Sequence, residues 1–359
     1  MTDGQSNDNA FRGKVTRDTT AYFLGDIYLP HPAIITDEIP GKLIYNLEAP
    51  LTRETRGWPE TVNLRCEDDH SVATFGRSPA AVCLANNHIM DFGSAGLSDT
   101  VRALEATDVA YFGAGAQADN CRNPLLLSIG DQTLGLVGYV CPTAHPVFAS
   151  SKHPGVAPID VAAIARDVAT ARGMGARRVV VCLHWGTEEV ELPRPQDVHL
   201  ARAIAELDVD LVIGHHAHCI QPFEVYDGVP IFYGLGNAIF PHIDAWMNYD
   251  EQGRPGEPFR KRQYYWNRPS LGVAYDVDTG SVRIDRWSCD GTTLRLVHQG
   301  VKSPELAFRS PAEYEARFKR HHSFAVWRKK IVNYVRNPRW PRYRHLRSLL
   351  SIAREARGA

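Results

Sequence analysis

Short apolar runs rich in β-branched residues recur along the first part of the chain, and most of them are followed by polar residues. Segments with apolar residues at helical spacing lie between these runs, an alternation typical of layered α/β proteins. The spacing predicts helices over residues 96–107, 159–172 and 196–207, and buried strands over 177–185 and 209–218. We therefore expect an α/β fold.

Five of the runs end in clusters of polar side chains. The clusters are Gly25-Asp26, Asn46-Leu47-Glu48, Asn86-Asn87-His88, His184-Trp185-Gly186 and Gly214-His215-His216-Ala217-His218. Binding sites of α/β sheets are built at the carboxyl ends of strands, where such clusters would meet. Burying these groups without partners is costly, whereas one divalent cation would satisfy several of them. The clusters therefore predict a metal site.

The residue types narrow the choice of metal. Neutral imidazole combined with carboxylate and amide oxygen suits Mn, Fe or Zn, whereas an all-oxygen set would suit Mg or Ca. The seven cysteines form no C-x-x-C pair, which argues against a structural cysteine–zinc site. Single residues also have ordinary explanations: Asp26 can cap a helix, and Asn87 can hold a left-handed turn. Three histidines at two strand ends favour an ion.

A strong charge asymmetry lies behind the net charge of −1. Residues 317–359 contain thirteen Lys or Arg and one acid, interleaved with aromatic residues. Such a tail can rest on an anionic membrane surface, dock on an acidic partner in a polymer-synthesis complex, or pack on the body as a helix. The absence of a recognised nucleic-acid motif disfavours nucleic acid. We expect a polar extension over 1–19, a body over 20–300 and a basic helical tail over 301–359.

Two segments of the body have their own signatures. Residues 242–269 are polar and rich in Gly, Pro, Trp and Tyr, which predicts a long loop of the kind that forms lids. The alternating pattern around Asp278-Thr279-Gly280 predicts a β-hairpin. The chain has no run of eighteen apolar residues and no opening like a signal peptide. Together with scattered, unpaired cysteines, this favours a cytoplasmic protein, with the tail as an optional contact to the inner face of the membrane.

Six motifs, in order over residues 21–240, resemble those of the CapA/PgsA capsule-synthesis family, a branch of the calcineurin-like metallophosphoesterase superfamily. They are GDIYLP, NLEAPLT, LANNHIMDFGSAGLSDT, HWGTE, GHHAHCIQPFEVY and FYGLGNAIF. The resemblance implies a four-layer αββα sandwich that holds one or two divalent ions. The ligands it implies are Asp26, Glu48, Asn87, His184, His216 and His218, with His215 as an alternative in the last motif.

The resemblance also implies catalytic roles. His88 would be a general acid, and Asp91 would orient its imidazole. The superfamily commonly begins with Asp-x-His and continues with Gly-Asp, whereas this chain has Asp26-Ile27-Tyr28 and Asn46-Leu47-Glu48. A centre with one ion is therefore the alternative to a centre with two.

The function that these features predict is metal-dependent phosphoester hydrolysis in capsule or exopolymer synthesis, with polysaccharide or poly-γ-glutamate as the polymer. The substrate would be phosphorylated or a polymeric anion. Arg53 and Arg65 are candidates to bind its negative charge, although both are equally explained as surface arginines, and His215 and Asn237 would line the site. The alternatives are a non-catalytic metal-binding scaffold of a polymer-synthesis complex and a metal-dependent amide or glycan hydrolase.

Overall fold

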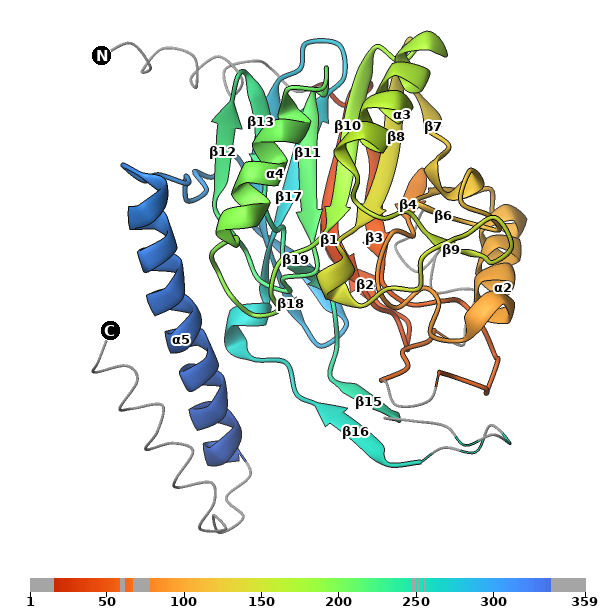
Figure 1. The fold of residues 1–359 in the computed structure, drawn as a ribbon, viewed down its shortest axis with the longest axis vertical. Coiled ribbons are helices and arrows are strands. Elements are labelled where there is room, and N and C mark those ends of the chain that lie inside the picture. Colours follow the sequence, from red (N-terminus) through yellow and green to blue (C-terminus); the bar gives the residue numbers. More distant parts are fainter. Residues whose placement is uncertain are drawn as a thin grey trace.

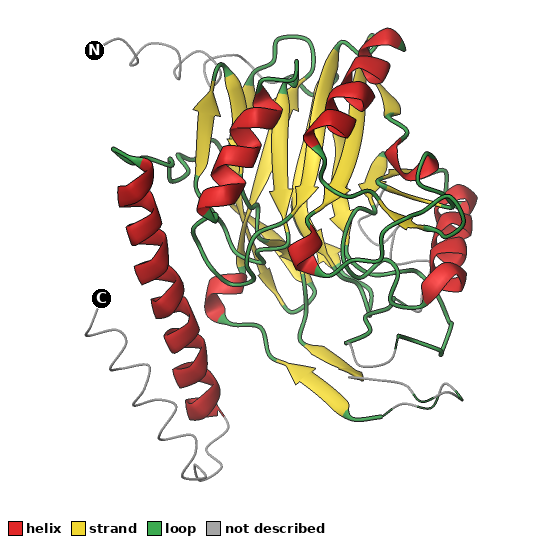
Figure 2. Cartoon of the chain, in the orientation of Figure 1, coloured by secondary structure: helices red, strands yellow, loops and turns green. Residues whose placement is uncertain are grey.

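The computed structural model describes residues 16–58, 62–66, 78–246, 250, 252, 254 and 256–336. In this part of the chain, two β-sheets face each other (Figure 1). Helices α3 (Val161–Gly173) and α4 (Pro195–Ala205) cover the smaller sheet, and α2 (Gly93–Ala106) packs on the larger one (Figure 2). The three helices predicted from the sequence are confirmed, as is the α/β sandwich.

The larger sheet has nine strands among the described residues. They are β1 (Thr20–Ile27), β2 (Ile34–Ile35), β3 (Lys42–Leu47), β4 (Ala81–Cys83), β5 (Ala110–Phe112), β14 (Asn237–Ile239), β17 (Pro269–Asp276), β18 (Val282–Asp290) and β19 (Thr293–His298). Their order is β2-β19-β18-β17-β1-β3-β4-β5, and β14 also pairs with β1. Because β1, β3, β4, β5 and β14 run parallel, the polar residues at the carboxyl ends of β1 and β3 lie at the same end of the sheet.

The smaller sheet has six strands in the described part of the chain. They are β7 (Leu125–Ile129), β8 (Gln132–Val140), β10 (Arg178–His184), β11 (Leu211–His215), β12 (Phe223–Tyr226) and β13 (Val229–Phe232), in the order β12-β13-β11-β10-β8-β7. Strands β8, β10, β11 and β13 are parallel, and the two edge strands are antiparallel to their neighbours. His184 and His215 are partners in register at the carboxyl ends of β10 and β11.

Alternation along β10 explains how this sheet buries both of its faces. Val180 and Cys182 belong to the core shared with the larger sheet. Val179 and Val181 instead join the core beneath α3 and α4. Side chains alternate between faces along a strand, so His184, two residues after Cys182, points toward the larger sheet. The hydrophobic pattern thus directs a polar side chain into the space between the sheets.

Residues 242–269 differ from the predicted loop. Strands β15 (Ile243–Trp246) and β16 (Pro258–Lys261) pair antiparallel as a two-stranded ribbon, followed by the 3-10 helix η4 (Tyr265–Asn267). The ribbon is short and carries Pro and charged residues, which hid it in a segment of loop-like composition. The predicted hairpin is confirmed: β17 and β18 pair antiparallel on either side of Asp278-Thr279-Gly280.

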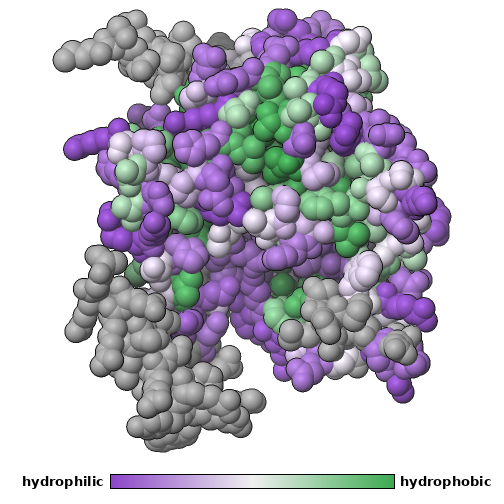
Figure 3. All heavy atoms as spheres, viewed as in Figure 1, coloured by the Kyte–Doolittle hydropathy of each residue, from purple (hydrophilic) through white to green (hydrophobic). Residues whose placement is uncertain are grey.

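Shorter elements connect the two sheets. Strands β6 (Ala114–Gly115) and β9 (Gly155–Val156) form a small pair. The 3-10 helices η2 (Asn120–Arg122) and η3 (Pro142–Ala144) lie in the connections around β7 and β8. On the face shown in Figure 3, hydrophobic residues gather near α3 and α4, and hydrophilic residues cover most of the rest.

The basic tail begins as a long helix, as predicted. Helix α5 (Pro311–Arg336) lies beside the body (Figure 1), and the Tyr314 hydroxyl donates a hydrogen bond of 2.6 Å to the Pro193 carbonyl. Phe324 and Trp327 are 51% and 41% exposed, so these two aromatic residues do not pack fully on the body. Among the described helices, none combines the length and apolar character that a membrane span requires. The expectations for residues 1–15 and 337–359 lie outside the described residues.

At the end of the sheets that carries the polar clusters, two glycines lie very close to neighbouring backbone. A Cβ atom at Gly25 would lie 1.9 Å from the Gly236 carbonyl oxygen, and one at Gly214 would lie 2.0 Å from the Tyr233 carbonyl oxygen. The Gly236 carbonyl also accepts a hydrogen bond of 3.0 Å from the Asp26 backbone N–H. These two glycines of the polar clusters are therefore required by packing.

We expect Gly25→Ala to lower the free energy of unfolding by about 1–3 kcal/mol or more, because the methyl group would force backbone apart. Urea denaturation measures this. Gly173→Ala is the matched control, since no atom lies within 4 Å of a Cβ there. The control should change stability by less than about 1 kcal/mol, and equal effects of the two substitutions would contradict the packing argument.

Candidate metal centre

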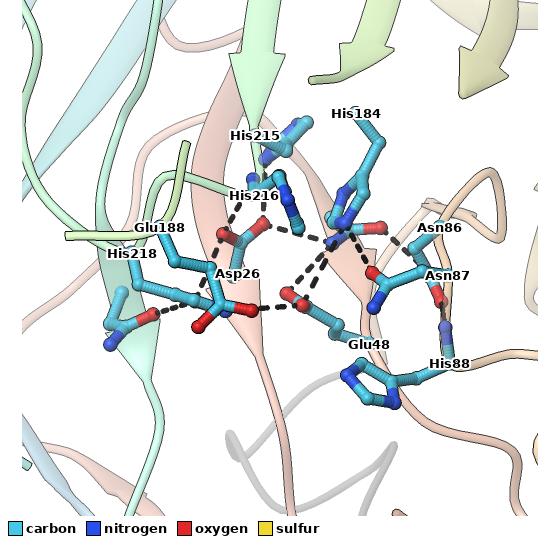
Figure 4. A network of polar contacts seen from close by, with 12 residues as sticks. Asp26, Glu48, Asn86, Asn87, His88, His184, Glu188, His215, His216 and His218 are labelled. Carbon is cyan, nitrogen blue, oxygen red and sulfur yellow. Dashed lines mark hydrogen bonds and ion pairs between the residues drawn. The ribbon is translucent and has the colours of Figure 1, made fainter. Parts of the chain in front are cut away.

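The polar strand ends converge in one buried cluster between the sheets. Figure 4 shows side chains from β1, β10 and the loops after β3, β4 and β11 pointing toward one another. The carboxylates and imidazoles at the centre are all buried: Asp26, Glu48, His184, His215, His216 and His218. The structure therefore brings together five of the six ligands that the resemblance implied in the core of the cluster, and Asn87 lies beside them.

Asn46 positions both carboxylates. Its Nδ2 donates hydrogen bonds to Oδ1 of Asp26 at 2.9 Å and to Oε2 of Glu48 at 3.3 Å. The second oxygen of Asp26 accepts a bond of 3.0 Å from the His216 backbone N–H, and Nδ1 of His215 lies 3.1 Å from Oδ1. Asn46 was part of a predicted polar cluster, but no role was predicted for it. Its position two residues before Glu48 was the available signal, because residues two apart along a strand lie on the same face.

Glu48 lies at the junction of two candidate ligand sets. Its Oε1 is 3.8 Å from Nε2 of His184 and 3.4 Å from Nε2 of His218. In the described part of the chain, Glu48, His184 and His216 form one group of potential ligand atoms, all within 4.8 Å of one another, and Asp26, Glu48 and His218 form the other. A carboxylate shared by two groups is compatible with either one or two ions.

The donor set fits a divalent cation. Oε1 of Glu48, Nδ1 of His184 and Nδ1 of His216 are buried and have no hydrogen-bond partner among the described residues. Buried polar atoms without partners are costly, and an ion would satisfy such atoms directly. Imidazole and carboxylate donors in this mixture suit Mn, Fe or Zn.

The surroundings keep the imidazoles available as ligands. Burial lowers the pKa of His184 and His218, and it lowers the pKa of His216 to about 4. These rings are therefore neutral near pH 7, the form that binds metal. Burial followed by the charge of Asp26 raises the pKa of Glu48. Burial alone would raise the pKa of Asp26 too, but the contact with His215 lowers it overall.

The backbone bends sharply where these histidines lie. His216 and His218 have positive φ values of 84° and 53°, in the left-handed region that residues other than glycine seldom adopt. Strand β11 consequently ends at His215, three residues earlier than the sequence predicted. Oδ1 of Asn237 lies 2.8 Å from Nδ1 of His218 and fixes the ring orientation. Of the predicted lining residues, His215 and Asn237 thus contact the candidate ligands.

A second group of polar residues adjoins the cluster after β4. Oδ1 of Asn87 lies 2.8 Å from Nε2 of His184. Asn86 holds the turn, because its Oδ1 accepts hydrogen bonds from the backbone N–H groups of His88 at 3.0 Å and Ile89 at 2.8 Å. No role was predicted for Asn86 from the sequence, although an asparagine at the start of a turn is a recognised signal.

His88 and Asp91 form a pair at the edge of the cluster. Nδ1 of His88 lies 2.8 Å from Oδ2 of Asp91, which also accepts a bond of 2.7 Å from the Leu64 backbone N–H. Burial by itself lowers the pKa of His88, but the Asp91 carboxylate raises it above its ordinary value overall. The pair therefore holds an oriented imidazole that keeps its proton to higher pH.

A cavity of about 620 Å³ opens beside this pair. Its wall includes Asn87, His88, Asp91, Glu188 and His216, together with apolar side chains and Trp58, Thr143 and His145. Trp58 was not anticipated; its indole N–H donates a hydrogen bond of 2.6 Å to the Met90 carbonyl, and its side chain is 44% exposed. His88 and His216 therefore both lie on the wall of this cavity.

The two predicted substrate-binding arginines lie elsewhere. Arg53 is exposed, and neither arginine is among the residues that line this cavity. Arg65 donates a hydrogen bond to the Glu54 carbonyl, and its guanidinium lies 5.5 Å from the centre of the Phe92 ring. Substrate binding by these arginines stays a prediction.

Fold and site together define a two-sheet α/β protein with a candidate metal centre at its strand ends. The chain belongs to the bacterial capsule synthesis protein family PGA_cap, whose model matches residues 41–242. The capsule biosynthesis protein CapA of Bacillus anthracis is 32% identical over 160 residues, which are 44% of this chain and 39% of that protein. A probable polyglutamine synthesis accessory protein of Mycobacterium tuberculosis is 32% identical over 219 residues, 58% of this chain and 57% of that protein.

The chain thus matches between two fifths and three fifths of the length of these relatives. A solved structure of a hypothetical protein from Thermus thermophilus covers 79% of this chain and 100% of that protein, at 14% identity and a TM-score of 0.41. A likeness at this level does not bear on activity.

We expect Glu48→Gln to weaken binding of Mn²⁺ at both candidate ligand sets by at least about tenfold, because the shared carboxylate loses its charge. His184→Ala should affect only the set that contains His184. Titration calorimetry and elemental analysis of the purified protein measure affinity and stoichiometry. Glu105→Gln, on the exposed face of α2, is the control. Unchanged metal content in Glu48→Gln would contradict the assignment.

Proposed function

We propose that the protein is a metal-dependent phosphoester hydrolase that acts in the synthesis of a capsule or other exopolymer. The observation that carries the proposal is the position of Glu48, which is shared by two imidazole–carboxylate sets. One of these sets includes His216, which lines the same cavity as His88. The names of the two relatives, which refer to capsule biosynthesis and polyglutamine synthesis, support the polymer context.

Asp26, Glu48, His184, His216 and His218 would hold the ion or ions. When bound, a divalent ion polarises phosphoryl oxygens and makes a water molecule more acidic. The buried carboxylates and neutral imidazoles of this cluster would keep the ion in place. They also exclude bulk water from one side of the site, where electrostatic interactions are therefore stronger.

His88 supplies the proton that the leaving oxygen needs. The Asp91 carboxylate accepts the hydrogen bond from Nδ1, so that in the protonated ring the transferable proton is the one on Nε2. General acid catalysis by an imidazole commonly contributes about 10²–10⁴-fold to the rate. Asp91 acts through His88 and is a positioning residue.

We expect His88→Ala to reduce kcat for hydrolysis of a generic aryl phosphodiester by about 10²–10⁴-fold, because the leaving group loses its proton donor. The assay uses protein loaded with Mn²⁺, and metal content is measured on the same sample. His199→Ala, an exposed histidine on α4, should retain full activity. Stoichiometric metal without turnover in the unmodified protein would overturn the hydrolase and favour the scaffold.

We expect Asp91→Asn to move the alkaline limb of the pH profile of kcat/KM to lower pH. The Asp91 carboxylate raises the pKa of His88 against the effect of burial, so its loss lowers that pKa. A general acid works while protonated, and activity therefore falls as pH rises through its pKa. A limb at the same pH in both proteins would show that His88 is not the titrating acid.

A further inference from the structure

We infer that a second cavity, between the β15–β16 ribbon and helix α5, is a subsite for the repeated carboxylate or phosphate groups of a linear anionic substrate. This cavity has a volume of about 650 Å³. Its wall consists of Glu188, His242, Phe259, Arg260, Lys261, Arg262, Gln263, Tyr264, Arg268, Lys329 and Asn333. The inference rests on the proposed function for the place where the substrate reacts.

The charge of the two cavities differs. Five lysines and arginines line the second cavity against one acid, Glu188. The described wall of the cavity at the candidate metal centre contains no lysine or arginine, and its acids are Asp91 and Glu188. Metal ions can neutralise the reacting group there, but further negative charges on a substrate would have no cation beside them. The second cavity supplies the missing cations.

The two cavities share a wall residue. Glu188 lines both of them, and it follows β10 and His184 by only a few residues. Nζ of Lys261 lies 3.0 Å from Oε2 of Glu188 and 3.1 Å from Oε1 of Glu189. The negative charge at the junction is therefore balanced by the protein, and it does not repel an anion that passes from one cavity to the other.

Three arginines remain available to a ligand. Arg260 and Arg262 lie 3.3 Å and 3.4 Å from the same exposed carboxylate, that of Asp244. Arg268 lies 3.6 Å from Asp290, whose side chain is 82% exposed. Exposed ion pairs contribute little to stability, so carboxylate or phosphate oxygens can replace these partners. Arginine is also the side chain best suited to two hydrogen bonds with either group.

Residues of α5 and of the segment after the ribbon form another part of the wall. Nζ of Lys329 on α5 lies 3.0 Å from Oε2 of Glu189, and the Tyr264 hydroxyl donates a hydrogen bond of 2.7 Å to Oδ1 of Asn333. The Arg328 guanidinium lies 3.8 Å from the centre of the Trp266 ring. Helix α5 is thereby fixed to the segment that follows the ribbon, and it closes one side of the cavity. A built cavity of this kind distinguishes the site from a loose group of surface cations.

The test measures binding of two polymers to the metal-loaded, full-length protein by fluorescence anisotropy. The polymers are fluorescently labelled linear polyglutamate and labelled polyphosphate. In the double variant Arg260→Ser with Arg262→Ser, we expect the Kd for one or both polymers to rise at least about tenfold, since two charge-assisted hydrogen-bonding groups are lost. The control is Arg286→Ser with Arg295→Ser, which removes the same charge from exposed positions on β18 and β19. The control should bind as the unmodified protein does.

Selective loss of polyglutamate binding assigns the subsite to carboxylates, and selective loss of polyphosphate binding assigns it to phosphates. Equal affinity of the double variant and the control for both polymers would overturn the subsite. A protein that binds polymer through Arg260 and Arg262 but hydrolyses no ester would retain the subsite and refute only the hydrolase.

Discussion

The buried carboxylate of Glu48 is the group on which the candidate centre depends. It is fully buried, receives a hydrogen bond from Asn46 on one oxygen and has no hydrogen-bond partner among the described residues on the other. A carboxylate in this state is unfavourable for the folded protein alone, and burial raises its pKa accordingly. Neutral imidazoles lie within 4 Å of the free oxygen. A cation between them would convert a costly arrangement into a stable one, and the cluster is therefore a candidate metal centre.

The fold provides this arrangement through parallel strand ends and close backbone contacts. Strands β1 and β3 bring Asp26 and Glu48 to the carboxyl end of the larger sheet. Strands β10 and β11 bring His184 and His215 to the facing end of the smaller sheet. Neither sheet carries a complete ligand set. The candidate centre therefore exists only when both sheets pack through their shared core, so that stability of the sandwich and formation of the site are coupled.

Local sequence signals predicted which polar residues lie at the ends of buried strands. The apolar run before His184 predicted a buried strand that ends there, and the cluster at residues 214–218 placed His216 and His218 at another strand end. Signals of that kind do not report contacts between distant segments. The role of Asn46 depends on a side chain from a neighbouring strand, and the position of Trp58 depends on a hydrogen bond to the loop after β4. The β15–β16 ribbon was missed because its pairing partners are separated by a segment of loop-like composition.

Helix α5 belongs to the surroundings of the site, although it contributes no candidate ligand among its described residues. A series of ion pairs runs from Lys329 on α5 to Glu189, from Glu189 to Lys261, and from Lys261 to Glu188 on the cavity wall. Glu189 has a left-handed backbone with φ of 64°, a conformation that persists only where the surroundings favour it. The contacts with two lysines supply such surroundings. Helix α5 of the basic tail therefore helps to shape the wall between the two cavities. This helix lies outside residues 41–242, which the family model matches.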